Sequence, residues 1–181
     1  MLKFAVVDLE TTGGHREDNR IMEVGIVLMD GSDVVGSYHS LVDPGLPITP
    51  FVRTLTGISD EMVQGQPQFG VIADHVAELL NDRIFVAHNV QFDCKYMSAE
   101  LKRCCIKFNP PRLCTVKLSR RVFPGLPSYS LHKLTESLGL PDFNHHRALD
   151  DTMAAAGILK LALDKVGETG VMKYVVNKGR G

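Results

Sequence analysis

The pattern of apolar and polar residues predicts β-strands in the first quarter of the chain. Residues 2–9 are almost continuously apolar and rich in β-branched side chains, which is typical of a largely buried strand. Residues 21–29 have the same character. After the turn-forming residues 30–33, the segment 34–42 alternates well enough to form a third strand. Because short loops join these three strands, we expect an antiparallel meander.

Beyond residue 44 the apolar positions follow helical spacing. After a loop at residues 44–50, residues 69–80 carry apolar side chains on one helix face, and residues 84–88 form a short buried strand. Residues 112–118 fit either a strand or the start of a helix. Further helices are predicted at residues 90–105, at residues 127–139 with Ser128 as N-cap, and at residues 147–166. This order predicts a mixed α/β sheet flanked by helices.

Length and composition are those of one globular domain. The chain has 181 residues, of which 44% are apolar and 23% are charged, so it can bury a core without disulfides or a structural metal. Disorder, a collagen-like chain and a coiled coil are excluded as the main architecture. We assign residues 1–167 to a single domain and residues 168–181 to a C-terminal tail, which we expect to be partly frayed.

Net charge and cysteine content limit how the chain could bind nucleic acid and where in the cell we expect it. The net charge is −1, so any binding to nucleic acid must depend on a local site and not on a basic surface. No stretch approaches the roughly 18 apolar residues of a membrane-spanning helix, and the N-terminus reaches Asp8 too early for a secretory signal. We therefore expect a cytoplasmic location. The four cysteines lack the paired spacing of zinc ligands, which favours reduced, structural thiols.

Two acids stand at the end of the first predicted strand. Asp8 and Glu10 are two residues apart, so both side chains leave the same face of the strand. Like charges this close repel each other, and burying unpaired carboxylates costs several kcal/mol for each ion. A divalent cation is the usual solution, and the alternative is a strand end that simply becomes polar.

Two further acids lie on predicted helices. Asp93 shares a helix face with Met97 and Leu101, which indicates either a ligand or an acid that favours the helix N-terminus. On the last helix, Asp151 falls on the apolar face and Asp150 on the polar face, at about 100° per residue. No Lys or Arg follows Asp151 at helical spacing, so an inward Asp151 needs a metal or a distant partner.

A histidine precedes Asp151 by five residues. His146 is of the type that serves as a general base near neutral pH, although a lone histidine such as its neighbour His145 is more often a solvated loop residue. Together with the four acids, it forms a set of oxygen ligands without thiolates, which favours magnesium or manganese. Two such ions about 3.5–4 Å apart stabilise a phosphodiester displacement, with a water deprotonated by His146 as nucleophile.

Three ordered motifs resemble those of the DEDDh 3′→5′ exonucleases. They are Phe4–Gly13 (FAVVDLETTG), His88–Asp93 (HNVQFD) and His146–Asp151 (HRALDD), and their order and spacing also agree. Within this family, Leu55–Ile58 and Leu118–Tyr129 resemble the proofreading exonuclease (epsilon) subunit or domain of bacterial DNA polymerase III. The resemblance implies a ribonuclease H-like fold. Its mixed five-stranded sheet has three antiparallel strands followed by parallel strands, flanked by helices.

The resemblance also implies roles for individual residues. The four acidic metal ligands match Asp8, Glu10, Asp93 and Asp151. These acids would hold two Mg²⁺ or Mn²⁺ ions, and the general base matches His146. The positions beside the terminal nucleotide and the second motif match Thr11, Thr12, Gly13, Ile58, His88 and Asn89. Cys114 departs from the pattern, because close relatives often carry Asp there, but it lies outside the catalytic set.

The expected function is a metal-dependent 3′→5′ exonuclease with a proofreading or repair role. It would release nucleoside 5′-monophosphates from the 3′ ends of single-stranded or frayed DNA. The expected partner is nucleic acid with a free 3′ end, and a DNA polymerase is a further candidate. One alternative is an exoribonuclease that trims RNA or short oligoribonucleotides, since the metal chemistry is indifferent to the sugar. The other is a catalytically silent nucleic-acid-binding or polymerase-accessory module.

Overall fold

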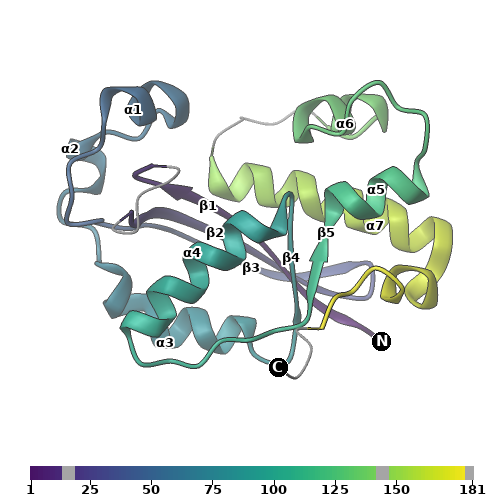
Figure 1. The fold of residues 1–181 in the computed structure, drawn as a ribbon, viewed down its shortest axis with the longest axis horizontal. Helices are drawn as coiled ribbons and strands as arrows, with labels where there is room; N and C mark the ends of the chain where they lie inside the picture. The colour runs from purple at the N-terminus through teal and green to yellow at the C-terminus, as the bar shows by residue number, and fades with distance from the viewer. Residues whose placement is uncertain (14–18, 142–146, 178–181) are drawn as a thin grey trace.

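A mixed sheet of five strands forms the centre of the described structure. The computed structural model describes residues 1–13, 19–141 and 147–177, and its strands lie in the order β3-β2-β1-β4-β5 (Figure 1). Their bounds are β1 Lys3–Thr11, β2 Ile21–Asp30, β3 Asp33–Leu41, β4 Ile84–Ala87 and β5 Arg112–Cys114. The first three strands pair antiparallel, whereas β4 runs parallel to β1, and β5 runs parallel to β4. The predicted fold class is therefore confirmed.

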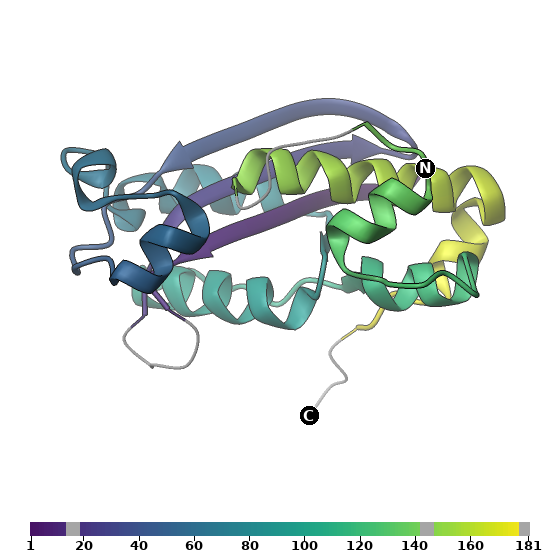
Figure 2. The same cartoon turned by 90° about the horizontal axis from the view of Figure 1, so that it is seen from above.

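Helices cover both faces of this sheet. Their bounds are α1 Pro50–Thr56, α2 Asp60–Val63, α3 Phe69–Leu80, α4 Val90–Arg103, α5 Thr115–Val122, α6 Leu131–Ser137 and α7 Ala148–Met172. Helices α3 and α4 pack on one face, and α5 and α7 pack on the other. The long helix α7 runs along β1 and β2 (Figure 2). In the part of the chain that the structure describes, none of the helices combines the length and apolarity needed to cross a bilayer.

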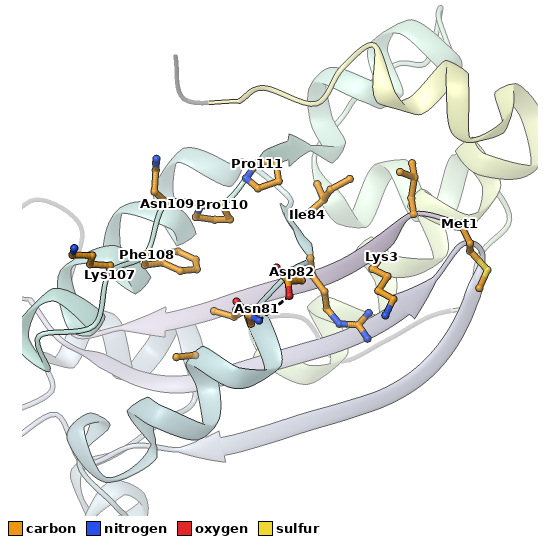
Figure 3. A pocket seen from close by; sticks show the side chains of 14 residues that line it. Met1, Lys3, Asn81, Asp82, Ile84, Lys107, Phe108, Asn109, Pro110 and Pro111 are labelled. Atoms are coloured by element: carbon orange, nitrogen blue, oxygen red, sulfur yellow. Dashed lines mark hydrogen bonds between the residues drawn. The ribbon is translucent and has the colours of Figure 1, made fainter. Parts of the chain in front are cut away.

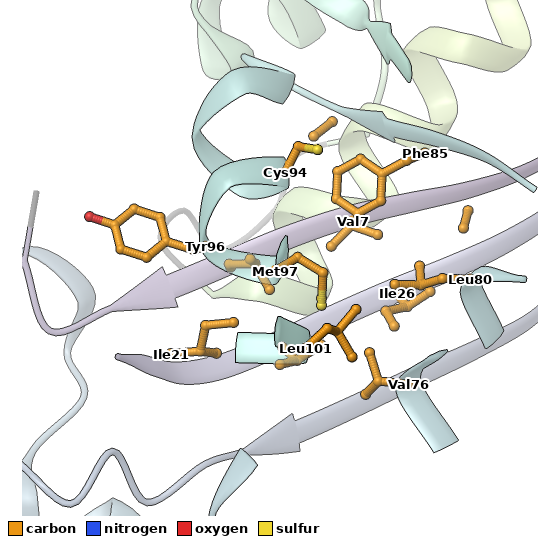
Figure 4. Packing of buried hydrophobic residues seen from close by; sticks show 14 of the residues in the cluster. Val7, Ile21, Ile26, Val76, Leu80, Phe85, Cys94, Tyr96, Met97 and Leu101 are labelled. Carbon is orange, nitrogen blue, oxygen red and sulfur yellow. The ribbon is translucent and has the colours of Figure 1, made fainter. Parts of the chain in front are cut away.

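The side chains of β1 alternate between two hydrophobic cores. Val7 and Leu9 belong to the cluster under α3 and α4, whose packing is shown in Figure 4. Val6 belongs to the cluster under α5 and α7. Since the side chains of a strand alternate with a period of two, Asp8 and Glu10 lie on the α7 face. The predicted common direction of the two acids is confirmed.

Some helix boundaries differ from the predicted ones. Helices α1 and α2 have no counterpart among the predicted elements. The segment 112–118 contains both predicted structures, because β5 ends at Cys114 and α5 begins at Thr115. The prediction of Ser128 as an N-cap is wrong. The N-cap of α6 is Ser130, and Ser128 instead accepts a hydrogen bond from the Ser130 amide at 3.2 Å in the preceding turn.

The described part of the predicted tail packs against the domain. Helix α7 is interrupted at Gly167, which has a positive φ of 67°, and continues to Met172. Val171 is fully buried in the cluster under α5 and α7. The backbone of Val176 pairs with Arg112 at the edge of β5. The described tail residues are thus attached to the domain at Val171 and Val176, and residues 178–181 lie outside the described part.

Candidate active site

Three carboxylates from two distant segments meet at the end of β1. Asp8 and Glu10 come from β1, and Asp151 comes from the first turn of α7. Each offers one oxygen, and the three oxygens lie within 4.8 Å of one another. Oxygen ligands of one divalent cation lie about 2.0–2.6 Å from the ion, so three oxygens at this separation can share one. Figure 1 shows the C-terminal end of β1 and the start of α7 close together.

Asp93 ties the start of α4 to the same strand. Its side chain is only 3% exposed, and its Oδ1 accepts a hydrogen bond from the Leu9 amide at 3.2 Å. Leu9 lies between the two acids of β1, so this bond places the Asp93 carboxylate beside them. The negative charge of Asp93 also acts on Asp8. The structure thus brings together the four acids that the sequence predicts.

The two adjacent acids of α7 have different surroundings. Asp151 is buried and joins Asp8 and Glu10. Asp150 is half-buried and, in the part of the chain that the structure describes, is not a member of that group. The helical wheel therefore assigned the two side chains correctly. Their difference arises because a helix turns by about 100° between successive residues.

Burial and mutual repulsion make these acids difficult to ionise. Burial raises the pKa of Asp8 well above its usual value, and the charges of Asp93, Asp151 and Glu10 raise it further. Burial also raises the pKa of Glu10 to about 8, with Asp151 adding to the effect and the Arg147 guanidinium opposing it. Burial likewise raises the pKa of Asp93. A divalent cation would favour the ionised form of each acid.

The donor set fits a hard divalent ion. The clustered ligand atoms are carboxylate oxygens, with no thiolate or imidazole in the group as the described residues define it. Such oxygen-only sites suit magnesium or manganese better than softer metals. The acidic cluster therefore has the ligand chemistry of a divalent-ion site. His146, the predicted general base, lies outside the described residues.

The segment after β1 is held by a polar network. Thr11 donates through its hydroxyl to the Gly13 carbonyl at 3.0 Å, and the Tyr96 hydroxyl donates to the same carbonyl at 3.1 Å. The Thr12 hydroxyl accepts a hydrogen bond from the Arg20 amide at 3.1 Å. The sequence reasoning missed Tyr96, which lies on α4 within a predicted helix and gave no separate signal. The nucleotide-binding role of Thr11, Thr12 and Gly13 stays a prediction.

His88 links two segments near the site. Burial lowers its pKa to about 4, so its ring is neutral near pH 7. A carbonyl can only accept, so Nε2 carries the proton and donates to the Tyr129 carbonyl at 3.0 Å. Nδ1 then accepts from the Thr115 hydroxyl at 2.9 Å. The side chain thus connects the end of β4 with the segment between α5 and α6.

The remaining predicted substrate residues have contrasting environments. Asn89 is exposed and precedes α4 in a left-handed backbone conformation, with a φ of 75°. Ile58 is fully buried with Met22 and Val52 beneath α1 and α2. A contact between the Ile58 side chain and nucleic acid would require this small core to open. Their substrate roles stay predictions.

One buried acid beside the cluster was missed. Glu23 on β2 is fully buried and faces Glu10 across the β1–β2 ladder. The signal in the sequence was an acid within the apolar run of residues 21–29.

A second feature, the surface hollow in Figure 3, is remote from this cluster. It has a volume of about 640 Å³. Lys3 and Ile84 line it at the N-terminal ends of β1 and β4, whereas the acidic cluster lies at the C-terminal end of β1.

The chain matches known exonucleases in sequence and in structure. The family model described as Exonuclease (RNase T) matches residues 5–159. The 3′-5′ exonuclease DinG of Staphylococcus epidermidis is 39% identical over 163 residues, which are 90% of this chain and 18% of the relative. Exonuclease X, solved in complex with 5′ overhanging duplex DNA, is 28% identical with a TM-score of 0.74, and the match covers 96% of this chain and 97% of that one. The nuclease domain of 3′hExo, a DEDDh family member solved with rAMP, shares the fold at 18% identity, with a TM-score of 0.77 and coverage of 90% and 92%.

These matches define the class of protein. Because the family model spans most of the chain, the chain belongs to the RNase T exonuclease family. The four clustered acids fit an exonuclease domain of this family. The chain spans only about 18% of the length of the DinG relatives.

Proposed function

We propose that the chain hydrolyses phosphodiester bonds from the 3′ ends of single-stranded or frayed DNA and releases nucleoside 5′-monophosphates. The observation that carries this proposal is the convergence of Asp8, Glu10 and Asp151 to within 4.8 Å at one end of the sheet. Exonuclease X, a relative of similar length, was solved with DNA that has an overhang. That match supports a DNA end as the substrate.

Each residue has a defined part in the proposed reaction. The four acids would hold two Mg²⁺ or Mn²⁺ ions, which would stabilise the negative charge that develops on oxygen during the displacement. His146 accepts a proton from the attacking water, whose oxygen forms a bond to phosphorus while the bond to the 3′ oxygen breaks. The leaving 3′ oxygen takes a proton from solvent. The Thr11–Gly13 segment and His88, Asn89 and Ile58 contact or support the terminal nucleotide.

The acidic cluster makes cations a requirement for substrate binding. In their ionised form, Asp8, Glu10 and Asp151 repel an approaching polyanion, and the protein as a whole has a net charge of only −1. Bound divalent ions reverse the local field without requiring a basic surface. Chelation with EDTA should therefore abolish cleavage, and added Mg²⁺ or Mn²⁺ should restore it.

A single digestion experiment tests the proposal. Matched DNA and RNA oligomers, labelled at the 3′ or the 5′ end, are digested over time with and without Mn²⁺. Early release of labelled mononucleotide from the 3′ end of DNA supports the proposal. Faster digestion of RNA would favour the exoribonuclease instead. DNA that is bound in Mn²⁺ without release of mononucleotide would favour the silent binding module.

The cellular setting remains a prediction from the sequence. Proofreading in association with a DNA polymerase, as the epsilon-like segments suggest, requires a stable complex between the two proteins. Co-purification of the chain with a replicative polymerase would support this role. A cytoplasmic location is the expectation that accompanies it, in keeping with four free cysteines.

A further inference from the structure

Glu23 lies in the core of the sheet next to the acidic cluster. It is located on β2, is 0% exposed, and pairs in register with Glu10 of β1. A charged group at such a position is costly unless all its oxygens find partners. The contacts of Glu23 therefore indicate why an acid is placed there.

The Glu23 carboxylate is bound by the residues that begin α7. Its Oε1 accepts hydrogen bonds from Arg147 Nη2 at 2.9 Å and Arg147 Nε at 3.1 Å. Its Oε2 accepts a hydrogen bond from the Ala148 amide at 3.0 Å. His39 Nε2 lies 2.7 Å from Oε1. Burial alone would raise the pKa of Glu23, but these hydrogen bonds lower it, so the carboxylate is ionised near neutral pH.

This contact replaces an ordinary helix cap. Arg147 is the N-cap residue of α7, and its side chain makes no capping hydrogen bond within its own helix. The cap is instead the Glu23 carboxylate, which satisfies one of the free amides of the first turn and lies at the positive end of the helix dipole. The start of α7 is therefore fastened to β2.

Gly25 allows α7 to approach β2 closely at the same place. A Cβ atom at this position would overlap the Ala148 carbonyl and lie 2.7 Å from the Leu149 amide nitrogen. These are backbone atoms, so α7 would have to move away from the sheet. Glu23 and Gly25 thus fix the helix start by attraction and by close fit.

The fixed helix start determines where Asp151 lies. The Asp151 amide donates to the Arg147 carbonyl at 3.0 Å, which is the first hydrogen bond of α7. A small shift of Arg147 and Ala148 would move the Asp151 carboxylate relative to Asp8 and Glu10. The 4.8 Å grouping depends on that placement.

We propose that Glu23 is a positioning residue, which fastens the start of α7 to β2 and thereby holds Asp151 where it shares a divalent ion with Asp8 and Glu10. This inference rests on the proposed function, since it assumes that these acids bind the ion. Both carboxylate oxygens of Glu23 are bound by protein groups, so Glu23 is not counted among the metal ligands. Residues that orient metal ligands typically contribute about 10- to 100-fold to metal affinity or activity.

Two variants keep the negative charge of residue 23 and disturb only the placement of the start of α7. Glu23→Asp retains a carboxylate that is one methylene too short to reach both Arg147 and Ala148, and Gly25→Ala pushes α7 away from the sheet. Glu23→Gln removes the charge but nearly keeps the shape. Asp30→Asn is the matched control, because it breaks an ion pair with Arg83 at the opposite end of the same strand.

Binding of Mn²⁺ alone is measured by electron paramagnetic resonance titration, together with the melting temperature, kcat and KM for single-stranded DNA. We expect Glu23→Asp and Gly25→Ala each to weaken Mn²⁺ binding about tenfold and to lower kcat about 10- to 100-fold, with a much smaller change in KM. Asp30→Asn should lower the melting temperature and leave Mn²⁺ affinity unchanged.

The outcomes separate this inference from the proposed function. Wild-type Mn²⁺ affinity in Glu23→Asp or Gly25→Ala would overturn the inference. A loss of Mn²⁺ affinity confined to Glu23→Gln would also overturn it, because the charge of Glu23 and not the placement of α7 would then matter. If Glu23→Asp does not give a cooperative melting transition, Gly25→Ala decides the same question without touching Glu23. Failure of the wild-type protein to bind Mn²⁺ or to cleave DNA would contradict the proposed function itself.

Discussion

Asp150 and Asp151 are adjacent residues of one type with different surroundings. Asp151 is buried with the acids of β1, whereas Asp150 is half-buried. We expect Asp151→Ala to lower kcat by about 10³-fold or more, which corresponds to about 4 kcal/mol of transition-state stabilisation. Asp150→Ala should lower kcat by less than about threefold. Steady-state kinetics on a single-stranded oligomer at saturating Mn²⁺ would measure both.

The Asp150→Ala variant is the internal control for folding and for helix propensity. Both substitutions place alanine in the first turn of α7, so effects on the helix itself should be similar. If Asp150→Ala proves the more damaging of the two, the assignment of Asp151 as the inward ligand is wrong.

His146 makes a separate prediction that depends on pH. A general base acts only when deprotonated, so kcat should rise as pH increases through the range where imidazole loses its proton, near 6.5. The measurement needs saturating Mn²⁺, because the raised pKa values of Asp8 and Glu10 make metal binding itself depend on pH. A flat profile, with the chemical step shown to limit the rate, would remove His146 from this role.

The directions of Asp8, Glu10 and Asp151 were predictable from periodicity. A period of two places Asp8 and Glu10 on one face, and a helical turn separates Asp151 from Asp150. Glu23 was not predictable in this way. Its partners Arg147 and Ala148 are 124 and 125 positions away, so no local pattern links them. The sequence could show a buried acid there but not what it binds.

At the scale of elements, predictability followed the length of the periodic pattern. Helix α3 has twelve residues and begins and ends where its apolar spacing predicts. Helix α1 has only seven residues and buries two of them, so its periodicity is too short to detect. The residues at its two boundaries are nevertheless typical helix start and stop residues. Thr49 caps the helix, Pro50 begins it, and Gly57 ends it with a φ of 70°.

His88 provides a test at this scale, because it joins β4 to the segment between α5 and α6. His88→Ala would leave the Thr115 hydroxyl and the Tyr129 carbonyl without their imidazole partner. We expect unfolding free energy to fall by about 1–3 kcal/mol. The melting temperature should fall by about 2–4 °C for each kcal/mol. Thermal unfolding monitored by circular dichroism would measure this.

Lys133→Ala is the control for this prediction. It removes an exposed ion pair with Glu136 on α6, which should contribute at most about 1 kcal/mol. An equal loss of stability in the two variants would show that the His88 contacts do not hold the two segments together.

At the scale of the whole molecule, the acidic cluster makes folding and metal binding interdependent. Without a cation, the folded state brings Asp8, Glu10, Asp93 and Asp151 together in a buried environment. Burial raises the pKa of Glu10 from an ordinary value of 4.5 to about 8, so the folded protein binds protons that the unfolded chain releases. Stability in EDTA should therefore fall as pH rises from about 4.5 to about 8 and then level off. For one group the slope is at most about 1.4 kcal/mol per pH unit.

Replacing Glu10 isolates this effect from the other titrating groups of the protein. In EDTA, Glu10→Gln should melt at nearly the wild-type temperature at pH 5, where Glu10 is protonated and uncharged in the folded protein. At pH 8 it should melt several degrees higher, because the substitution removes the repulsion. In Mn²⁺ at pH 8, the wild-type protein should melt at a higher temperature than Glu10→Gln, because the wild-type cluster gains stability from the ion that it binds. Differential scanning calorimetry at the two pH values, with and without Mn²⁺, would measure all four differences. A wild-type protein more stable than Glu10→Gln in EDTA at pH 8 would mean that the acids are not in electrostatic conflict, and the physical reason for expecting a cation between them would be lost.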